Sequence, residues 1–74
     1  MPKTVSERVR LAFKSRKRPL SDERLHNHPL LRRELGSTVR TRRKEWQDAG
    51  RLQVAGLDVN SRGRVVTTYR WYGR

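Results

Sequence analysis

The residues best suited to chemistry in this chain are the basic side chains between positions 32 and 44. This segment holds five arginines and one lysine against the single acid Glu34, a local net charge of +5. A guanidinium presents a rigid fork of donors that grips a phosphate or a base edge bidentately, whereas the lysine ammonium acts as a point charge. The segment therefore predicts contact with a phosphate-rich polyanion. The alternatives are a solvated helix face and a compositional bias toward arginine.

The composition of the whole chain favours the same chemistry. Its 74 residues include 19 Lys or Arg and 7 Asp or Glu, a formal net charge of +12. Self-repulsion of this size destabilises a compact state, which favours an anionic partner such as duplex DNA. A hydrophobic content of 32% with two tryptophans argues against a disordered basic tail. The length predicts one domain over residues 4–72, with a short basic arm at 1–3 and a tail at 73–74.

Several other classes of function are disfavoured. The chain has no cysteine, and its two histidines lie two residues apart, so no metal and no cofactor are expected. Ser21, Asp22 and His26 are close in sequence but lack the context of a catalytic nucleophile, so we expect no enzyme. The longest apolar run is three residues, from Leu11 to Phe13, too short for a membrane span or signal peptide. A cytoplasmic, nucleoid-associated location is expected.

The first half of the chain shows helical periodicity. Thr4 and Glu7 fit the capping-box pattern, and apolar residues at helical spacing predict a first helix from about residue 5 to 16. Pro19 disfavours its continuation. Ser21 is predicted to cap a short second helix, followed by one further turn before position 36.

A third helix is predicted over residues 37–48, capped by Ser37 and ended by Gly50. At about 100° per residue, Val39 and Trp46 lie on one face of this helix. We expect that face to point into the core. The opposite face, which carries hydroxyl groups and cations, is then expected to point into solvent.

The period changes to two after the third helix. Leu52 and Val54 alternate, and Gly56 then breaks the phase, which indicates a bulge or bend. A turn at 60–63 joins this segment to a second alternating run that ends at Trp71. Two such runs with a glycine-containing turn predict a β-hairpin. The predicted fold class is therefore α+β, with three helices followed by a hairpin.

The stretch GSTVRTRRKEWQDAGRL, residues 36–52, resembles the recognition helix of small winged helix-turn-helix DNA-binding proteins, including compact phage-encoded regulators. The resemblance covers residues 4–72 in the order of elements and residues 36–52 in detail. It implies a recognition helix in the major groove and a hairpin wing beside it. The chain departs from the pattern at Trp46, where an aliphatic residue is more usual, and in the irregular segment 26–35.

The candidate site residues follow from this division of faces. Residues expected to contact bases are Ser37, Thr38, Arg40, Thr41 and Lys44. Residues expected to contact the DNA backbone are Arg32, Arg33 and Arg42. At the wing tip, 60–64, Arg62 and Arg64 are expected to reach the adjacent minor groove or backbone. The predicted function is a duplex DNA-binding module, acting as a sequence-reading transcriptional regulator, in the form of a monomer or weak dimer on DNA.

Two other partners stay open. Structured RNA or the ribosome is one alternative, because A-form helices also present dense phosphate. A small protein-interaction module that modifies a host machine is another, and its binding would depend on the apolar edges of the hairpin or first helix.

Two further groups of residues can each be interpreted in two ways. The basic cluster around residues 14–18 either contacts phosphate from the side or keeps a loop soluble; its members are Lys14, Arg16, Lys17 and Arg18. Trp46, Tyr69 and Trp71 could stack unpaired bases, as single-strand binders do. We favour core packing for these aromatics, because a hairpin with few aliphatic residues needs their buried area.

Overall fold

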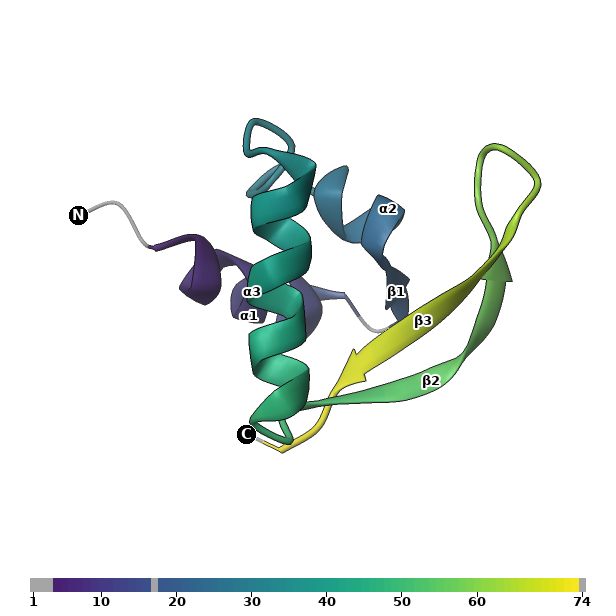
Figure 1. Ribbon diagram of the computed structural model, residues 1–74. Coiled ribbons are helices and arrows are strands. Elements are labelled where there is room, and N and C mark those ends of the chain that lie inside the picture. Colours follow the sequence, from purple (N-terminus) through teal and green to yellow (C-terminus); the bar gives the residue numbers. More distant parts are fainter. Residues whose placement is uncertain (1–3, 17, 74) are drawn as a thin grey trace.

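The chain forms a small α+β domain with three helices and a three-stranded antiparallel sheet (Figure 1). A computed structural model describes residues 4–16 and 18–73. The elements follow in the order α1 (Val5–Ser15), β1 (Leu20–Ser21), α2 (Asp22–His26), α3 (Gly36–Asp48), β2 (Leu52–Val59) and β3 (Val65–Trp71). The predicted α+β class, with three helices and a C-terminal hairpin, is confirmed. The predicted basic arm at 1–3 lies outside the described residues.

Helix α1 begins and ends where its sequence predicts. The Thr4 hydroxyl accepts a hydrogen bond from the Glu7 backbone N–H at 3.2 Å, which satisfies one of the free donors of the first turn. The helix stops at Ser15, and Arg16 is already extended. Its inward face buries Val9 and the pair that follows it one turn later, Ala12 and Phe13.

Strand β1 was not predicted. Leu20 pairs with Tyr69, and Ser21 pairs with Thr68, so the sheet has the order β1-β3-β2. Two residues are too few to show a period, and only the partner strand makes them a strand. Ser21 also caps α2 as predicted, since its hydroxyl accepts from the Arg24 backbone N–H at 3.3 Å.

The predicted cap of α3 is wrong by two residues. The helix begins at Gly36, and Leu35 occupies the cap position without a side-chain hydrogen bond, so Ser37 lies inside the first turn. Tertiary contacts set this start: the His26 ring donates from Nε2 to the Glu34 carbonyl at 2.7 Å. A Cβ on Gly36 would lie 3.7 Å from the same ring, an ordinary contact distance, so the chain enters α3 beside α2.

The end of α3 matches the prediction. Gly50 has φ +79°, a conformation that a side chain would disfavour. Its N–H donates to the Gln47 carbonyl at 3.0 Å, and the Arg51 N–H donates to the Trp46 carbonyl at 3.0 Å. This pair of bonds is a Schellman motif. It turns the chain directly into β2, where Leu52 is buried in the core.

The phase break at Gly56 is a β-bulge, as predicted. Val54 pairs with Tyr69 and Gly56 pairs with Thr68, so Ala55 is the extra residue on β2. Because directly paired residues share a face of the sheet, the bulge returns Leu57 to the face that carries Val54. One apolar stripe therefore continues along the hairpin, although the sequence changes parity.

The core lies where the two strands of the hairpin and all three helices meet. Its buried hydrophobic residues are Val9, Ala12, Phe13, Leu20, Leu25, Leu31, Val39 and Leu52. The half-buried aromatics Trp46, Tyr69 and Trp71 pack against it, which confirms the predicted core role of these side chains. The rings of the two tryptophans meet edge to face with centroids 5.1 Å apart. Among the described residues, no helix is both long enough and apolar enough to traverse a bilayer.

Candidate nucleic-acid interface

Helix α3 separates its apolar and cationic sides as the sequence predicts. Val39 is 1% exposed, and the indole N–H of Trp46 donates to the Ser6 carbonyl of α1 at 2.8 Å. This bond, together with the buried valine, fixes the rotation of α3 about its axis. Arg40 and Lys44 are consequently exposed on the outer side, and neither has an ion-pair partner among the described residues.

The hydroxyl groups predicted to contact bases are not equally available. Ser37 and Thr41 are exposed, whereas Thr38 is half-buried. The Thr41 hydroxyl donates to the Ser37 backbone carbonyl at 2.9 Å, so its proton is engaged within the helix. The Thr41 oxygen can still accept a hydrogen bond, because a hydroxyl that donates once keeps its lone pairs.

The Arg43 side chain connects α3 to α2 and β3. Its guanidinium donates to both carboxylate oxygens of Asp22 at the start of α2, with N–O distances of 2.8 and 3.1 Å. It also lies over the Tyr69 ring of β3, 4.4 Å from the ring centroid, and donates to the Gln47 side chain at 2.6 Å. One side chain therefore links α2, α3 and β3. No local pattern predicts these partners of Arg43, because they lie 21 and 26 positions away.

The predicted backbone-contacting arginines differ in their surroundings. Arg32 and Arg33 are exposed in the turn before α3. That turn is held from α1, where Arg8 donates to the Leu30 carbonyl at 3.1 Å and pairs with Glu34 at 3.0 Å. Arg42 is half-buried and pairs with Glu45 one turn along α3, so its charge is offset within the helix.

The hairpin tip is ordered by its own hydrogen bonds. The Asn60 side-chain oxygen accepts from the backbone N–H groups of Arg62 and Arg64, both at 2.9 Å. Gly63 has φ +77°, which this tight turn requires of it. Both arginine side chains are exposed at the tip, as the sequence predicts.

Helix α2 holds this tip in place. The Glu23 carboxylate accepts from the Ser61 hydroxyl and from the Ser61 backbone N–H at 3.1 Å. Arg24 pairs with Asp58 of β2 at 3.3 Å. The hydrogen bonds from Ser61, with the positive charges of Arg62 and Arg24, lower the pKa of Glu23 from its usual 4.5. The tip and α3 therefore share a support, α2, which sets the distance between the two cationic surfaces.

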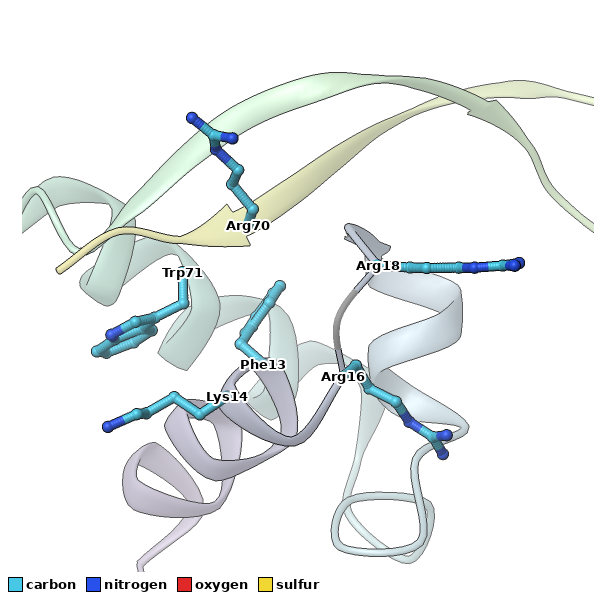
Figure 2. A pocket seen from close by; sticks show the side chains of 6 residues that line it. All are labelled: Phe13, Lys14, Arg16, Arg18, Arg70 and Trp71. Carbon is cyan, nitrogen blue, oxygen red and sulfur yellow. The ribbon is translucent and has the colours of Figure 1, made fainter. Parts of the chain in front are cut away.

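A second group of cations surrounds a hollow between α1 and β3 (Figure 2). The cavity measures about 320 Å³. Its lining residues are Phe13, Lys14, Arg16, Arg18, Arg70 and Trp71. The predicted cluster at 14–18 thus gains Arg70 from β3 as a neighbour, which only the tertiary fold could reveal; Lys17 lies outside the described residues.

Comparison of the chain with protein-family models, with curated proteins and with solved structures gave no match. The function must therefore be inferred from the geometry and chemistry of the chain itself.

Proposed function

We propose that this chain is a winged helix-turn-helix module that binds duplex DNA and acts as a transcriptional regulator. In this proposal α3 enters the major groove, and the hairpin tip lies on the adjacent minor groove or the backbone. The observation that carries the proposal is the rotation of α3. Trp46 is tied inward to Ser6, so Arg40 and Lys44 stand exposed on one outer side.

The arrangement of the other cations supports the same partner. In Figure 1 the start of α3 and the hairpin tip both lie in the upper part of the domain, with α2 between them. Exposed cations without ion-pair partners among the described residues mark both places: Arg32, Arg33, Arg40 and Lys44 near α3, and Arg62 and Arg64 at the tip. A wide major groove of about 12 Å accepts a helix, and arginine reads guanine edges there.

Salt dependence tests the proposal quantitatively. If these six side chains each neutralise a phosphate, the slope of log K against log salt is about −5, because each contact contributes about −0.9. Affinity then falls roughly a thousandfold between about 50 and 200 mM salt. Selection of bound duplexes from a random pool at moderate salt tests sequence reading. An enriched motif supports a regulator, whereas affinity without enrichment leaves only a backbone binder.

The variant Arg40→Ser/Lys44→Ser tests the assignment of α3. Both side chains are exposed, so the fold should persist, and duplex affinity should fall at least tenfold. The matched control is Arg18→Ser/Arg70→Ser, which removes the same charge from the hollow between α1 and β3. Equal affinity of the α3 variant and the unaltered protein for every duplex would refute the assignment. Duplex RNA of the same length, used as competitor, separates DNA binding from structured-RNA binding.

One observation favours the protein-interaction alternative. The apolar stripe of the hairpin is strongly exposed toward the tip, with Val54, Leu57, Val59 and Val65 at 59%, 73%, 55% and 66%. Protein–protein contact sites are often marked by such patches. Replacing Leu57 and Val59 by threonine should leave duplex binding unchanged if DNA is the partner. Loss of a partner recovered from nuclease-treated extract, with duplex binding intact, would favour the alternative.

A further inference from the structure

The hollow between α1 and β3 is separate from the proposed duplex interface. Its lining comes from the end of α1, from the segment before β1 and from the end of β3, and α3 contributes none of it. Trp71 at its floor meets Trp46 on the inner side of α3. The outer side of α3 and this hollow therefore lie on different sides of the core.

Four positive side chains border this small space without a balancing acid. Lys14, Arg16, Arg18 and Arg70 are all exposed, and none takes part in an ion pair among the described residues. None of the described residues that line the hollow is acidic. Like charges held together raise the energy of the free protein, and a bound anion relieves that repulsion. The favoured ligand therefore carries negative charge.

The floor of the hollow is aromatic. Phe13 is 4% exposed at its base, and Trp71 is half-buried beside it. Figure 2 shows the Trp71 ring next to Phe13 and Lys14, while the guanidinium groups of Arg16 and Arg18 point away from the hollow and Arg70 extends from the opposite side of β3 to Trp71. Single-strand binding proteins combine a cationic track for the backbone with aromatic rings on which bases stack.

The size of the hollow limits the ligand. About 320 Å³ is near the lower end of ligand pockets, which run from about 300 to 1,000 Å³. In a duplex the bases are stacked inside and their faces are not available. An unpaired base can leave the strand and meet the aromatic floor, while the phosphates on either side remain near the surrounding arginines.

The larger groove between α2 and the hairpin lacks these properties. Its lining includes Glu23 and Asp58, which are engaged with Ser61 and Arg24. Arg16 and Arg18 also border this groove, but there the two carboxylates lie among the cations and offset part of their charge, so the groove is less favourable for an anion than the hollow.

We propose that the hollow formed by Phe13, Lys14, Arg16, Arg18, Arg70 and Trp71 binds an unpaired nucleotide of single-stranded nucleic acid. The base packs against the part of the half-buried Trp71 ring that the core and the Arg10 guanidinium, 5.9 Å from the ring centroid, leave exposed, and the neighbouring phosphates lie on the surrounding arginines. The chain then has two nucleic-acid sites of different preference on different sides of one core. This site does not depend on the proposed duplex-binding role of α3.

The test measures binding of the full chain to a labelled oligothymidylate of about ten nucleotides, within the usual site size of single-strand binders. Arg18→Ser/Arg70→Ser should weaken this binding at least about tenfold and change duplex binding less than about threefold. Arg40→Ser/Lys44→Ser removes the same charge, and it should leave oligothymidylate binding within about threefold. Circular dichroism verifies that both variants fold.

Tryptophan fluorescence tests the stacking itself. Trp46→Phe leaves Trp71 as the one fluorescent tryptophan, and oligothymidylate should quench it; Trp71→Phe should show no quenching. Thymidine monophosphate should compete with the oligonucleotide more strongly than inorganic phosphate, because the base contributes contact with the floor.

The outcomes separate this inference from the proposed function. Equal loss of oligothymidylate binding in both double variants, or no loss in the Arg18/Arg70 variant, overturns the inference, as does absence of quenching at Trp71. If the Arg40/Lys44 variant keeps full duplex affinity while the Arg18/Arg70 variant loses single-strand binding, the duplex proposal fails and this inference stands.

Discussion

The contact between Arg43 and Asp22 gives the sharpest test of how α3 is held. The side chains are 12% and 31% exposed, and the guanidinium makes two hydrogen bonds to the carboxylate. Arg43→Met keeps most of the aliphatic stem and removes the charge. Asp22→Asn keeps the shape and removes the opposite charge. Together they form a double-mutant cycle across the junction of α2 and α3.

The expected magnitude follows from the geometry. Hydrogen bonds to charged groups contribute about 1.5–3 kcal/mol, and the partial exposure of Asp22 places this pair near the lower end. The guanidinium also lies 4.4 Å from the Tyr69 ring centroid, a contact that contributes about 0.5–1 kcal/mol. We therefore expect Arg43→Met to cost about 2–3 kcal/mol and Asp22→Asn about 1–2 kcal/mol. For a domain of this size, about 1 kcal/mol shifts Tm by about 4–8 °C.

Urea unfolding of the four proteins of the cycle measures the coupling energy, which should be about 1–2 kcal/mol. A value below about 0.5 kcal/mol, the level of independent sites, would refute the assigned contact. Measuring duplex binding by Asp22→Asn distinguishes a positioning role of Asp22 from a purely electrostatic one. Asp22→Asn makes the chain more positive, so simple electrostatics predicts tighter binding. If Asp22 acts by positioning α3, binding weakens instead, despite the gain in net charge.

Three further predictions concern single side chains. Trp46→Phe removes the indole hydrogen bond to Ser6, whereas Trp71→Phe removes none, because the buried indole N–H of Trp71 has no partner among the described residues. Chemical denaturation should therefore show a free energy of unfolding about 1 kcal/mol lower for Trp46→Phe than for Trp71→Phe. Burial, with the charge of Arg16, lowers the pKa of His28 below 6.5, so the unfolded chain binds the proton more readily than the folded one. The free energy of unfolding should therefore fall as pH drops through 6.5 and below, and His28→Asn should flatten this pH dependence. Because the pKa of Glu23 is lowered, its hydrogen bonds to the hairpin tip persist above pH 4.5 and break as pH falls below that value. The rate of amide exchange at the tip should rise in that acidic range, and Glu23→Gln should raise this rate already at neutral pH.

The parts of the fold that depend on neighbouring residues could be predicted from the sequence. Helix α1 has its cap and apolar face within eleven residues, and Gly50 ends α3 through bonds to the preceding turn. The bulge was visible as a change of parity at Gly56. In each case the signal and the structure that it specifies lie within a few positions of each other.

The parts set by distant residues could not be predicted. Strand β1 exists only because Leu20 pairs with Tyr69, and the turn before α3 is tied to the His26 ring through the Glu34 carbonyl. For the candidate site, the exposure of Arg40 and Lys44 agrees with the predicted faces of α3. The partner of those two side chains stays a prediction.

The placement of acids explains how so small a domain carries its charge. Five acids each pair with an arginine, and Glu23 binds Ser61. Two of the ion pairs each lie within a single helix, and the other contacts join α1 to the turn before α3, α2 to α3 and α2 to the hairpin. Asp48 is the remaining acid, exposed and without an ion-pair partner among the described residues. It lies at the end of α3, where a carboxylate repels phosphate. The cations Arg40 and Lys44 stand earlier in the helix, so in the proposed complex the polyanion contacts α3 before its last turn. That polarity is the one that a recognition helix needs, because its N-terminal residues are those that reach the bases.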